Sequence, residues 1–419
     1  MATSTSILWN NPDYRAWFAG DTSAKFVGSL RAFGLPLAVV ALTGSATQAG
    51  LIATASQAIG ILCMIPGGVV VDRIDRRKLL YTFAALGTII WTTIATLFAL
   101  EALTFPVLIT LTSLGAVNGG LFGQTTDVVL RTLVHGENLV KASAANHGRD
   151  ATIEVTAPPA GAALFALGSW VPFAASVVGY LLLGLCARLI HHDLRPRADA
   201  ASETGGVRML WANFANDVVD AYRYVRAHPT ILQLLTPAAI SNIGFIGIQY
   251  AITFALVLDG QSPGAIAAYN MATAGCAFAG SLLAGRYSAR FRTGWVYSVA
   301  IPATALAMVP TIFSLRYAVI VPCMGLYLGL SIMTAGHHSI IFSTAPTAMQ
   351  GRLWAVFGLI TSLPLAAAPT IAGLILDHGN YHVAMALFFI LLFMPSLAWA
   401  AMPRVRTLPR PADWGNIDL

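Results

Sequence analysis

The chain has 419 residues, of which 57% are hydrophobic and only 10% are charged, against roughly 25% charged residues in ordinary soluble domains. This composition excludes a large soluble domain and predicts one membrane-embedded body, because each membrane span needs ~20 apolar residues. The net charge of +6 does not indicate nucleic-acid binding, since the basic residues lie between apolar runs and form no patch interleaved with aromatic residues.

Twelve apolar runs separated by turn signals predict an all-α membrane protein with twelve transmembrane helices. The runs are continuous rather than alternating, which excludes a β-barrel. The first six predicted spans cover residues 16–42, 48–71, 79–100, 105–126, 145–167 and 172–190. The second six cover residues 230–258, 264–289, 295–314, 317–341, 353–376 and 383–402. We therefore expect an N-terminal bundle, a cytoplasmic linker, a C-terminal bundle and a tail, over residues 1–190, 191–229, 230–402 and 403–419.

The positions of the basic residues predict how the chain is oriented in the membrane. Most of the 24 lysines and arginines lie in connections on one side of the predicted spans, which places that side and both termini in the cytoplasm. The connections 43–47, 168–171 and 259–263 carry no lysine or arginine and are expected to face outward. The long polar stretch between the halves contains a flexible segment at 202–206, followed by an amphipathic helix at 210–225 on the inner membrane surface.

The N-terminal stretch does not indicate a signal peptide, and the cysteines and histidines do not indicate a metal site. The polar start lacks a short apolar core followed by a cleavage site, so we expect no signal peptide. The cysteines all lie inside apolar runs without a C-x-x-C pair, which favours packing roles over a disulfide framework or a zinc site. They are Cys63, Cys186, Cys276 and Cys323. His378 and His382 are spaced as metal ligands of a helix, but the intervening Gly379-Asn380 favours a loop, and we expect no metal site.

A charged stretch interrupts the apolar sequence between the second and third spans. Glycines that permit close helix packing are followed by an acid, an arginine and, one turn later, two further arginines. This motif comprises Gly67, Gly68, Asp72, Arg73, Arg76 and Arg77. A solvated loop between two helices is the simpler interpretation of such a charged run. Only the spacing of its residues indicates a functional motif.

This spacing resembles the loop between helices 2 and 3 of major facilitator superfamily transporters, and the six-plus-six helices and central linker extend the resemblance over the whole chain. The N-terminal part resembles the bacterial drug:proton antiporter-3 branch, which includes enterobactin exporters and macrolide efflux proteins. The segments that carry this resemblance are Asn11-Pro12-Asp13-Tyr14-Arg15, Gly20-Asp21-Thr22, Leu35-Pro36-Leu37 and Leu42-Thr43-Gly44-Ser45. Lys25 and Arg31 depart from the uncharged polar residues usual in that branch, and Ala157-Pro158 departs from its Gly-Pro.

The resemblance implies a latch at the cytoplasmic ends of the helices. Asp72 would be the gating acid, and Arg76 and Arg77 would pair with Asp127 at the end of the fourth helix. Arg352 in the second half would supply the opposing surface. The two halves repeat weakly at a fixed offset, and the second copy of the motif has Gly285 in place of the acid, which predicts an asymmetric gate. At the same offset Asp127 corresponds to His338, so His337 and His338 form either a pH-sensitive latch or ordinary polar packing.

Ionisable residues inside spans are costly and indicate a substrate or ion pathway. In this chain they concentrate in the first half, at Asp21, Lys25, Arg31, Asp127, Arg131, Arg149, Asp150 and Glu154. With a helix rise of ~1.5 Å per residue, Lys25 and Glu154 come to one level, and Asp21 comes level with Arg149 and Asp150. Making and breaking a Lys25–Glu154 contact would load and release a proton. Asp21 with Arg149 could equally be a buried ion pair that locks two helices.

Uncharged polar side chains predict a central cavity that suits an amphipathic organic molecule. They are Asn118, Asn242, Gln249, Tyr250 and Asn270. For each of them a hydrogen bond between helices is the simpler alternative. Lys25 and Arg31 would favour an acidic or zwitterionic molecule, provided that the nearby acids do not neutralise them.

We therefore expect a monomeric secondary transporter of the bacterial inner membrane that exports a small amphipathic compound, such as a drug, an antibiotic or a siderophore-like molecule, in exchange for protons. Alternatives are uptake or facilitated transport of an anionic metabolite, and a non-transporting membrane receptor or assembly factor of the same fold. The absence of a P-loop argues against an ATP-driven pump, and no nucleophile-base pair or cofactor motif indicates an enzyme. The expected partners are the substrate, protons and the lipid bilayer, with no nucleic acid and no cofactor beyond the proton gradient.

Overall fold

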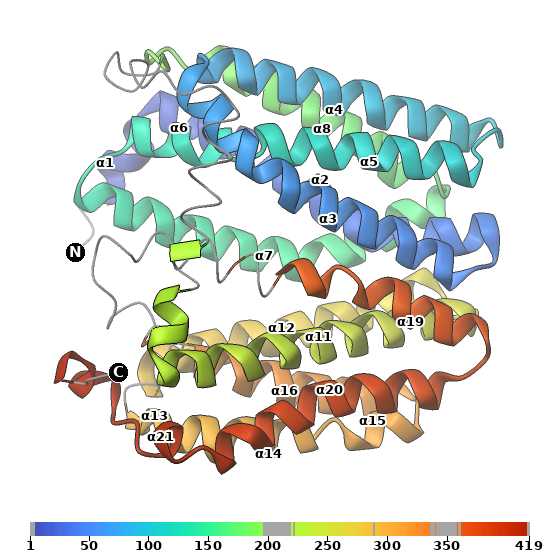
Figure 1. Ribbon diagram of the computed structural model, residues 1–419. Coiled ribbons are helices and arrows are strands. Elements are labelled where there is room, and N and C mark those ends of the chain that lie inside the picture. Colours follow the sequence, from blue (N-terminus) through green and yellow to red (C-terminus); the bar gives the residue numbers. More distant parts are fainter. Residues whose placement is uncertain are drawn as a thin grey trace. The chain divides into compact units, whose positions relative to one another are not determined.

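The computed structural model describes residues 5–195, 219–220, 223–287, 290–335, 340, 358 and 362–416, and their regular structure is helical throughout (Figure 1). The helices of the first half are α1 (Thr5–Asn10), α2 (Pro12–Thr43), α3 (Ala46–Arg73), α4 (Arg76–Ala99), α5 (Phe105–Phe122), α6 (Thr125–Leu133), α7 (Glu137–Leu167) and α8 (Val171–Leu189). Those of the second half are α11 (Pro229–Leu258), α12 (Pro263–Tyr287), α13 (Thr293–Trp295), α14 (Ile301–Leu306), α15 (Val309–Phe313), α16 (Tyr317–Ala335), α19 (Ala368–Asp377), α20 (Tyr381–Ala401) and α21 (Pro403–Arg406). A π-helical turn (Val296–Ala300) joins α13 to α14, and a short 3-10 helix (Pro411–Asn416) follows α21.

The helices follow the predicted spans closely, which confirms the all-α prediction. Within the described residues, nine helical segments are long and apolar enough to cross a membrane. Shorter apolar helices, Tyr317–Leu330 and Ser362–Asp377, occupy the described parts of the predicted tenth and eleventh spans. The predicted fifth span is α7, which is 31 residues long and carries charged side chains along its first half.

Local signals in the sequence fix where several helices begin and end. The Asn11 side chain accepts hydrogen bonds from the backbone N–H groups of Asp13 and Tyr14, at 2.9 and 3.3 Å, and so caps the start of α2. The same helix ends at Gly44, whose φ of +67° is a left-handed conformation that glycine adopts without strain. Asp75 caps α4 by accepting from the backbone N–H of Arg77 at 2.9 Å.

The described helices form two compact units. Unit 1 consists of Met1–Gly44, Ala55–Leu210 and Ser262–Ala268, and unit 2 consists of Ser45–Thr54, Trp211–Gln261 and Tyr269–Leu419. In unit 1, α2 packs against α7 and α8, and α4 packs against α5 and α8. In unit 2, α11 packs against α19 and α20. The first turns of α3 therefore belong to unit 2, whereas the rest of that helix belongs to unit 1.

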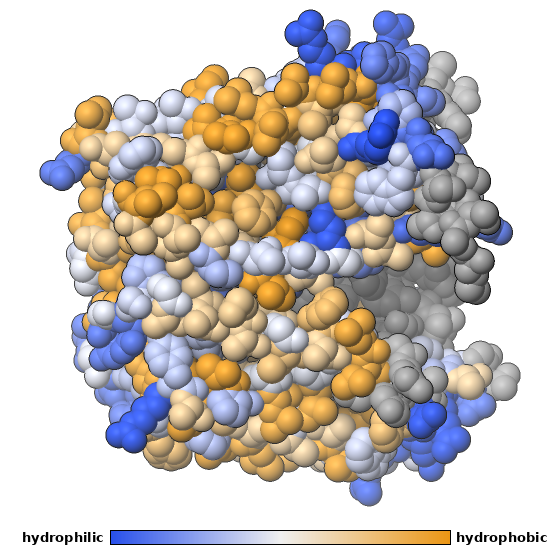
Figure 2. All heavy atoms as spheres, turned by 180° about the vertical axis from the view of Figure 1, so that it is seen from behind, coloured by the Kyte–Doolittle hydropathy of each residue, from blue (hydrophilic) through white to orange (hydrophobic). Residues whose placement is uncertain are grey.

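Side chains on the flanks of the helices fit a lipid environment. Large hydrophobic residues are exposed there, for example Ile89 on α4, Leu181 on α8 and Ile390 on α20. Figure 2 shows hydrophobic residues over the flanks of the helices, with the most hydrophilic residues gathered towards their ends. This pattern is the one expected for helices surrounded by acyl chains, because the apolar surface has no aqueous solvent to avoid.

Candidate functional site

The candidate site is a cluster of charged side chains on α2, α6 and α7 in unit 1. At its centre, Arg149 Nη1 lies 2.7 Å from Asp21 Oδ2, and the exposed fractions of the two side chains are 7% and 3%. The Arg149 guanidinium also donates to Asp150 Oδ1, from Nη2 at 2.8 Å and from Nε at 3.0 Å. The predicted proximity of Asp21, Arg149 and Asp150 is confirmed, and one arginine bridges both carboxylates.

Neighbouring groups hold the Arg149 guanidinium in place. Arg149 Nη1 donates to Thr22 Oγ1 at 3.5 Å, and its Cζ lies 5.2 Å from the centre of the Phe18 ring, both on α2. The arginine thus meets α2 through an ion pair, a hydroxyl and an aromatic face. The pair links α2 to α7, because removing either partner would leave a buried charge.

The outer part of the cluster is open and unevenly charged. Lys25, Asp127 and Glu154 are exposed in the absence of a membrane. The charged groups that act on Asp127 are Lys25, Asp21, Arg131 and Asp150. The charged group that acts on Glu154 is Asp150, which has the same sign.

The predicted pairing of Lys25 with Glu154 is therefore wrong for this conformation. No ion pair joins them within the described ranges, and Lys25 acts on Asp127 instead. Helix rise correctly gives the two residues a common depth, but depth alone does not fix the direction in which each side chain leaves its helix. Lys25 acts on the charge of Asp127 on α6, and no ion pair of Glu154 is found among the described residues.

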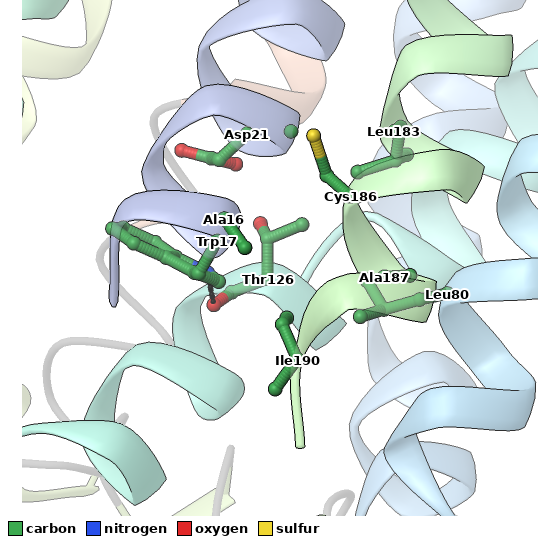
Figure 3. Close-up of a pocket in the computed structure, with 10 residues that line it drawn as sticks. Ala16, Trp17, Asp21, Leu80, Thr126, Leu183, Cys186, Ala187 and Ile190 are labelled. Atoms are coloured by element: carbon green, nitrogen blue, oxygen red, sulfur yellow. Dashed lines mark hydrogen bonds between the residues drawn. The ribbon is translucent and has the colours of Figure 1, made fainter. Parts of the chain in front are cut away.

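A small pocket lies beside the central ion pair (Figure 3). Asp21, Thr126 and Cys186 line it, and Figure 3 shows their side chains on three different helices around the same space. Trp17 closes one side by donating its indole N–H to the Thr126 carbonyl at 2.7 Å. The other residues that line the pocket are mostly apolar, among them Leu80, Leu183 and Ile190, so the carboxylate of Asp21 lies beside a largely hydrophobic space inside the bundle.

Arg31 occupies an aromatic site deeper along α2. Its Cζ lies 4.5 Å from the centre of the Trp91 ring and 5.3 Å from that of Tyr180, and its Nη2 donates to the Tyr180 hydroxyl at 3.4 Å. Among the described residues no carboxylate pairs with it, and its Nη1 is buried without a hydrogen-bond partner. The cation is held by the ring faces rather than by an acid.

The motif between α3 and α4 makes different contacts from those predicted. Arg77 Nη2 donates to the carbonyl oxygens of Ile190 and His192, at 2.5 and 3.0 Å, at the C-terminal end of α8. The backbone N–H of Arg76 donates to the Leu194 carbonyl at 3.4 Å. Arg77 therefore satisfies free carbonyls at a helix end, where a cation is favoured by the helix dipole.

The predicted ion pairs of Asp127 with Arg76 and Arg77 are correspondingly absent in the described part of the chain. The charges that act on Asp127 are those of Lys25, Arg131, Asp21 and Asp150. Asp72 and Arg73 are exposed at the end of α3. The remaining predicted gating residues, Arg352, His337 and His338, lie outside the described residues, as does most of the predicted linker helix.

Gly67 lies at a close approach of α3 to α5. A Cβ atom at Gly67 would be 2.5 Å from the Gly120 carbonyl oxygen, whereas one at Gly68 would have only Gln124 Oε1 at 4.0 Å. Gly67 therefore permits backbone contact between the two helices, and Gly68 does not share that role.

The predicted cavity residues lie on helices of both units. Asn118 is 2% exposed, and its Nδ2 donates to the Phe83 carbonyl at 3.2 Å, so it makes the hydrogen bond between helices that was its simpler interpretation. On α11, Asn242 is exposed, and Gln249 and Tyr250 are half-buried, as is Asn270 on α12. These four residues belong to unit 2, whereas Asn118 belongs to unit 1.

Sequence reasoning assigned no role to Asp377, the last residue of α19. Its carboxylate accepts from Ser45 Oγ at 2.6 Å and from the backbone N–H groups of Ala46 and Thr47, at 2.8 and 2.9 Å. The sequence signal was an acid directly after an apolar span, but nothing in the sequence indicated its partner, which is 330 residues away.

Comparisons with known proteins agree with this architecture. Residues 24–369 match the family model described as Major Facilitator Superfamily. A bacterial homologue of the human lysosomal transporter Spinster, solved in an inward-facing and unoccupied conformation, superposes with a TM-score of 0.70 at 13% identity, covering 95% of this chain and 98% of that one. The nucleoside transporter NupG gives 0.69 at 11% identity, covering 93% and 98%.

A bacterial homologue of the iron transporter ferroportin, in its inward-facing state, gives a TM-score of 0.66 at 15% identity, covering 93% of this chain and 99% of that one. At these identities the likeness shows the fold, and the predicted twelve-helix fold is confirmed. No curated protein matches the sequence.

Proposed function

Because the chain belongs to the major facilitator superfamily, we propose that it is a proton-coupled secondary transporter that exports a small amphipathic organic compound by alternating access. Membership of this family of transporters gives transport, rather than catalysis, as the general activity. The N-terminal resemblance to the drug:proton antiporter-3 branch supports export and a drug- or siderophore-like substrate.

The observation that carries proton coupling is the charge imbalance of the cluster in unit 1. Four carboxylates act on one another there together with three cations: Asp21, Asp127, Asp150 and Glu154 with Lys25, Arg131 and Arg149. A net charge at this depth is costly in a membrane, and taking up one proton makes the cluster neutral.

Glu154 is the carboxylate best placed to take up that proton. Asp21 and Asp150 share Arg149, and Asp127 faces Lys25 and Arg131. Asp150, of the same sign, acts on Glu154, no ion pair holds Glu154 among the described residues, and its side chain is exposed on the surface of α7. Proton binding at Glu154 would relieve this repulsion, and proton release would restore it, which gives the cluster two charge states for the two directions of a transport cycle.

A second candidate function, transport of an anionic metabolite, is favoured by Arg31. Its guanidinium has a buried Nη1 without a partner and no acid paired with it within the described ranges. A substrate carboxylate or phosphate would satisfy that donor. Export of an amphipathic compound remains the first proposal, because Arg31 is half-buried against the Trp91 and Tyr180 rings, whereas the outer part of the charged cluster is exposed.

The proposed setting is the inner membrane of a bacterium, with both termini in the cytoplasm and the protein acting as a monomer. The concentration of basic residues in the connections predicted to be cytoplasmic supports this orientation. The exposed hydrophobic flanks support direct contact with lipid.

The test compares cells with and without the protein on a panel that contains a macrolide, a catecholate siderophore and an amphipathic cationic dye. Compounds whose toxicity or retention falls are then followed in proteoliposomes under an imposed pH gradient. Export coupled to protons predicts that the compound moves against the direction of proton flow. Movement with the protons would favour uptake, and absence of any flux would favour a non-transporting receptor.

A further inference from the structure

Three segments of unit 2 come together where membrane spans of that unit begin or end. α11 begins at Pro229, α13 begins the span Thr293–Phe313, and α20 ends at Ala401. The chain that follows α20, residues 402–416, folds back on the other two, and its helix α21 contacts both α11 and α13 (Figure 1). We call residues 402–416 the C-terminal strap. In the orientation proposed above, this end of unit 2 faces the cytoplasm.

Backbone hydrogen bonds join the C-terminal strap to the first turn of α13. The Thr293 N–H donates to the Pro409 carbonyl at 3.0 Å. The Gly294 N–H donates to the Leu408 carbonyl at 3.1 Å. The first N–H groups of a helix have no acceptor within the helix, and here the strap supplies one to each of two. A Cβ atom at Gly294 would overlap the Arg406 carbonyl, so the close approach of the two backbones requires glycine.

Side chains of the C-terminal strap anchor it in the core of unit 2. Val405 and Leu408 are 0% and 4% exposed, and they share one buried cluster with Val225, which lies just before α11. Trp414 packs against that cluster and donates its indole N–H to the Thr293 hydroxyl at 3.1 Å. The strap is therefore a fixed part of unit 2, and it holds its exposed side chains beside those of the α13 start.

The exposed side chains on the three segments are strongly cationic. Within the described residues 223–228, 290–295 and 402–416, Asp413 is the only acid. Exposed arginines lie on all three segments, and five of them form no ion pair with any described residue. We call these five the arginine patch: Arg226, Arg292, Arg404, Arg406 and Arg410.

A pair of aromatic rings borders the arginine patch. Phe291 and Trp295 stack with their ring centroids 5.3 Å apart, and the exposed fractions of the two residues are 41% and 47%. They flank Arg292 and the buried start of α13. Exposed aromatic residues at the end of a span lie at the level of the lipid headgroups, where their rings meet both acyl chains and polar groups. The rings therefore place the arginine patch at the depth of the lipid phosphates.

We propose that the arginine patch binds the phosphate headgroups of anionic phospholipids in the inner leaflet, with Phe291 and Trp295 against their acyl chains. A guanidinium donates paired hydrogen bonds to phosphate oxygens, and each arginine near an anionic leaflet strengthens binding about fivefold. A zwitterionic lipid carries its own cation and has no net charge to offset that of the patch. The C-terminal strap creates this site, because it brings Arg406 and Arg410 beside Arg292.

The test counts the lipids that the purified full-length chain retains from detergent. The protein is equilibrated with equal amounts of phosphatidylglycerol and phosphatidylcholine that have the same acyl chains, and bound lipid is identified by native mass spectrometry. The native chain should retain phosphatidylglycerol in preference. In the triple variant Arg404→Gln/Arg406→Gln/Arg410→Gln, the phosphatidylglycerol concentration for half-saturation should rise on the order of a hundredfold. All three side chains are exposed, so the variant should keep the thermal stability that the native chain has without lipid.

The matched control is the triple variant Arg15→Gln/Lys78→Gln/Arg188→Gln. These residues are exposed at ends of unit 1 helices that are also expected to be cytoplasmic, and the control makes the same change in net charge. It should bind phosphatidylglycerol as the native chain does. Raising the salt concentration from about 0.05 M to about 0.5 M should weaken binding to the native chain, because exposed charges are screened.

A further arm distinguishes a lipid headgroup from a free phosphate. Glycerol 3-phosphate at the same concentration should not displace the lipid, because it lacks the acyl chains that contact the aromatic rings. Displacement would overturn the lipid assignment in favour of a soluble anion. Equal retention of the two lipids by the native chain, or equal losses in the two triple variants, would overturn the patch itself. The assay involves no transport, so failure of the proposed function appears in the flux experiment alone.

Discussion

Replacing Asp21 by Asn should destabilise the protein by breaking its most buried ion pair. Removing one partner of a buried pair costs about 3–5 kcal/mol, because the other charge stays behind without compensation. Here Arg149 keeps Asp150 at 2.8 Å, and the Asp150 side chain is 39% exposed. Because Asp150 still partly compensates the charge of Arg149, we expect a decrease in unfolding free energy at the lower end of that range, about 3 kcal/mol.

The measurement is a double-mutant cycle on unfolding in mixed detergent micelles, with Asp21→Asn, Arg149→Met and the double variant. Because the second substitution removes the charge that the first leaves unpaired, the double variant should be more stable than the sum of the two losses predicts, by about 2 kcal/mol. Thr22→Val is the matched control, since its hydroxyl contacts Arg149 only at 3.5 Å and should contribute little. Losses that add to within about 0.5 kcal/mol would refute the claim that the pair couples α2 to α7.

Two further predictions concern helix contacts. Gly67→Ala should lower the unfolding free energy by about 1–3 kcal/mol, because the new methyl group would overlap the Gly120 carbonyl. The control Gly68→Ala should have almost no effect on the unfolding free energy. Equal thermal stability of the two variants would contradict the close approach of α3 and α5. The lowered pKa of Asp377 means that its contact with residues 45–47 is stabilised above the ordinary carboxyl pKa and loses that stability as pH falls through the lowered value. Hydrogen exchange of residues 45–54, corrected for its intrinsic pH dependence, should therefore stay flat from about pH 9 to about pH 6 and rise only below about pH 4, and a rise near neutral pH would indicate a histidine instead.

The fold was predictable from the sequence because lipid imposes a simple rule on it. A span must be a long apolar helix, so the ends of α2, α8 and α20 follow from where the apolar runs stop. Local caps added precision, since Asn11 with Pro12 marks the start of α2 and Gly44 marks its end.

The details of the charged cluster were only partly predictable. The rise per residue of a helix predicted that Asp21 and Arg149 lie at the same depth, and their ion pair confirms this prediction. The same reasoning failed for Lys25 and Glu154, because the rotation of each helix about its axis is set by packing over its whole length and not by local sequence. Arg77 shows a related limit: its partners are backbone carbonyls, which any sequence would provide.

Asp377 could not have been assigned from the sequence at all. Its cap on α3 depends on which helices become neighbours, and no property of the acid or of the Ser45-Ala46-Thr47 segment identifies the other. A contact between backbone groups and a distant side chain requires no particular residue types at the backbone positions, so it produces almost no recognisable pattern in a single amino-acid sequence.

The proposal that Glu154 carries the coupled proton is tested most directly by separating exchange from proton-driven transport in proteoliposomes, with a compound that the panel identifies. Glu154→Gln should still exchange the compound down its own gradient but should no longer concentrate it when a pH gradient is imposed. The matched control Glu137→Gln, at the exposed start of the same helix, should concentrate it as the native chain does. A Glu154→Gln variant that concentrates the compound as strongly as the native protein would contradict the account.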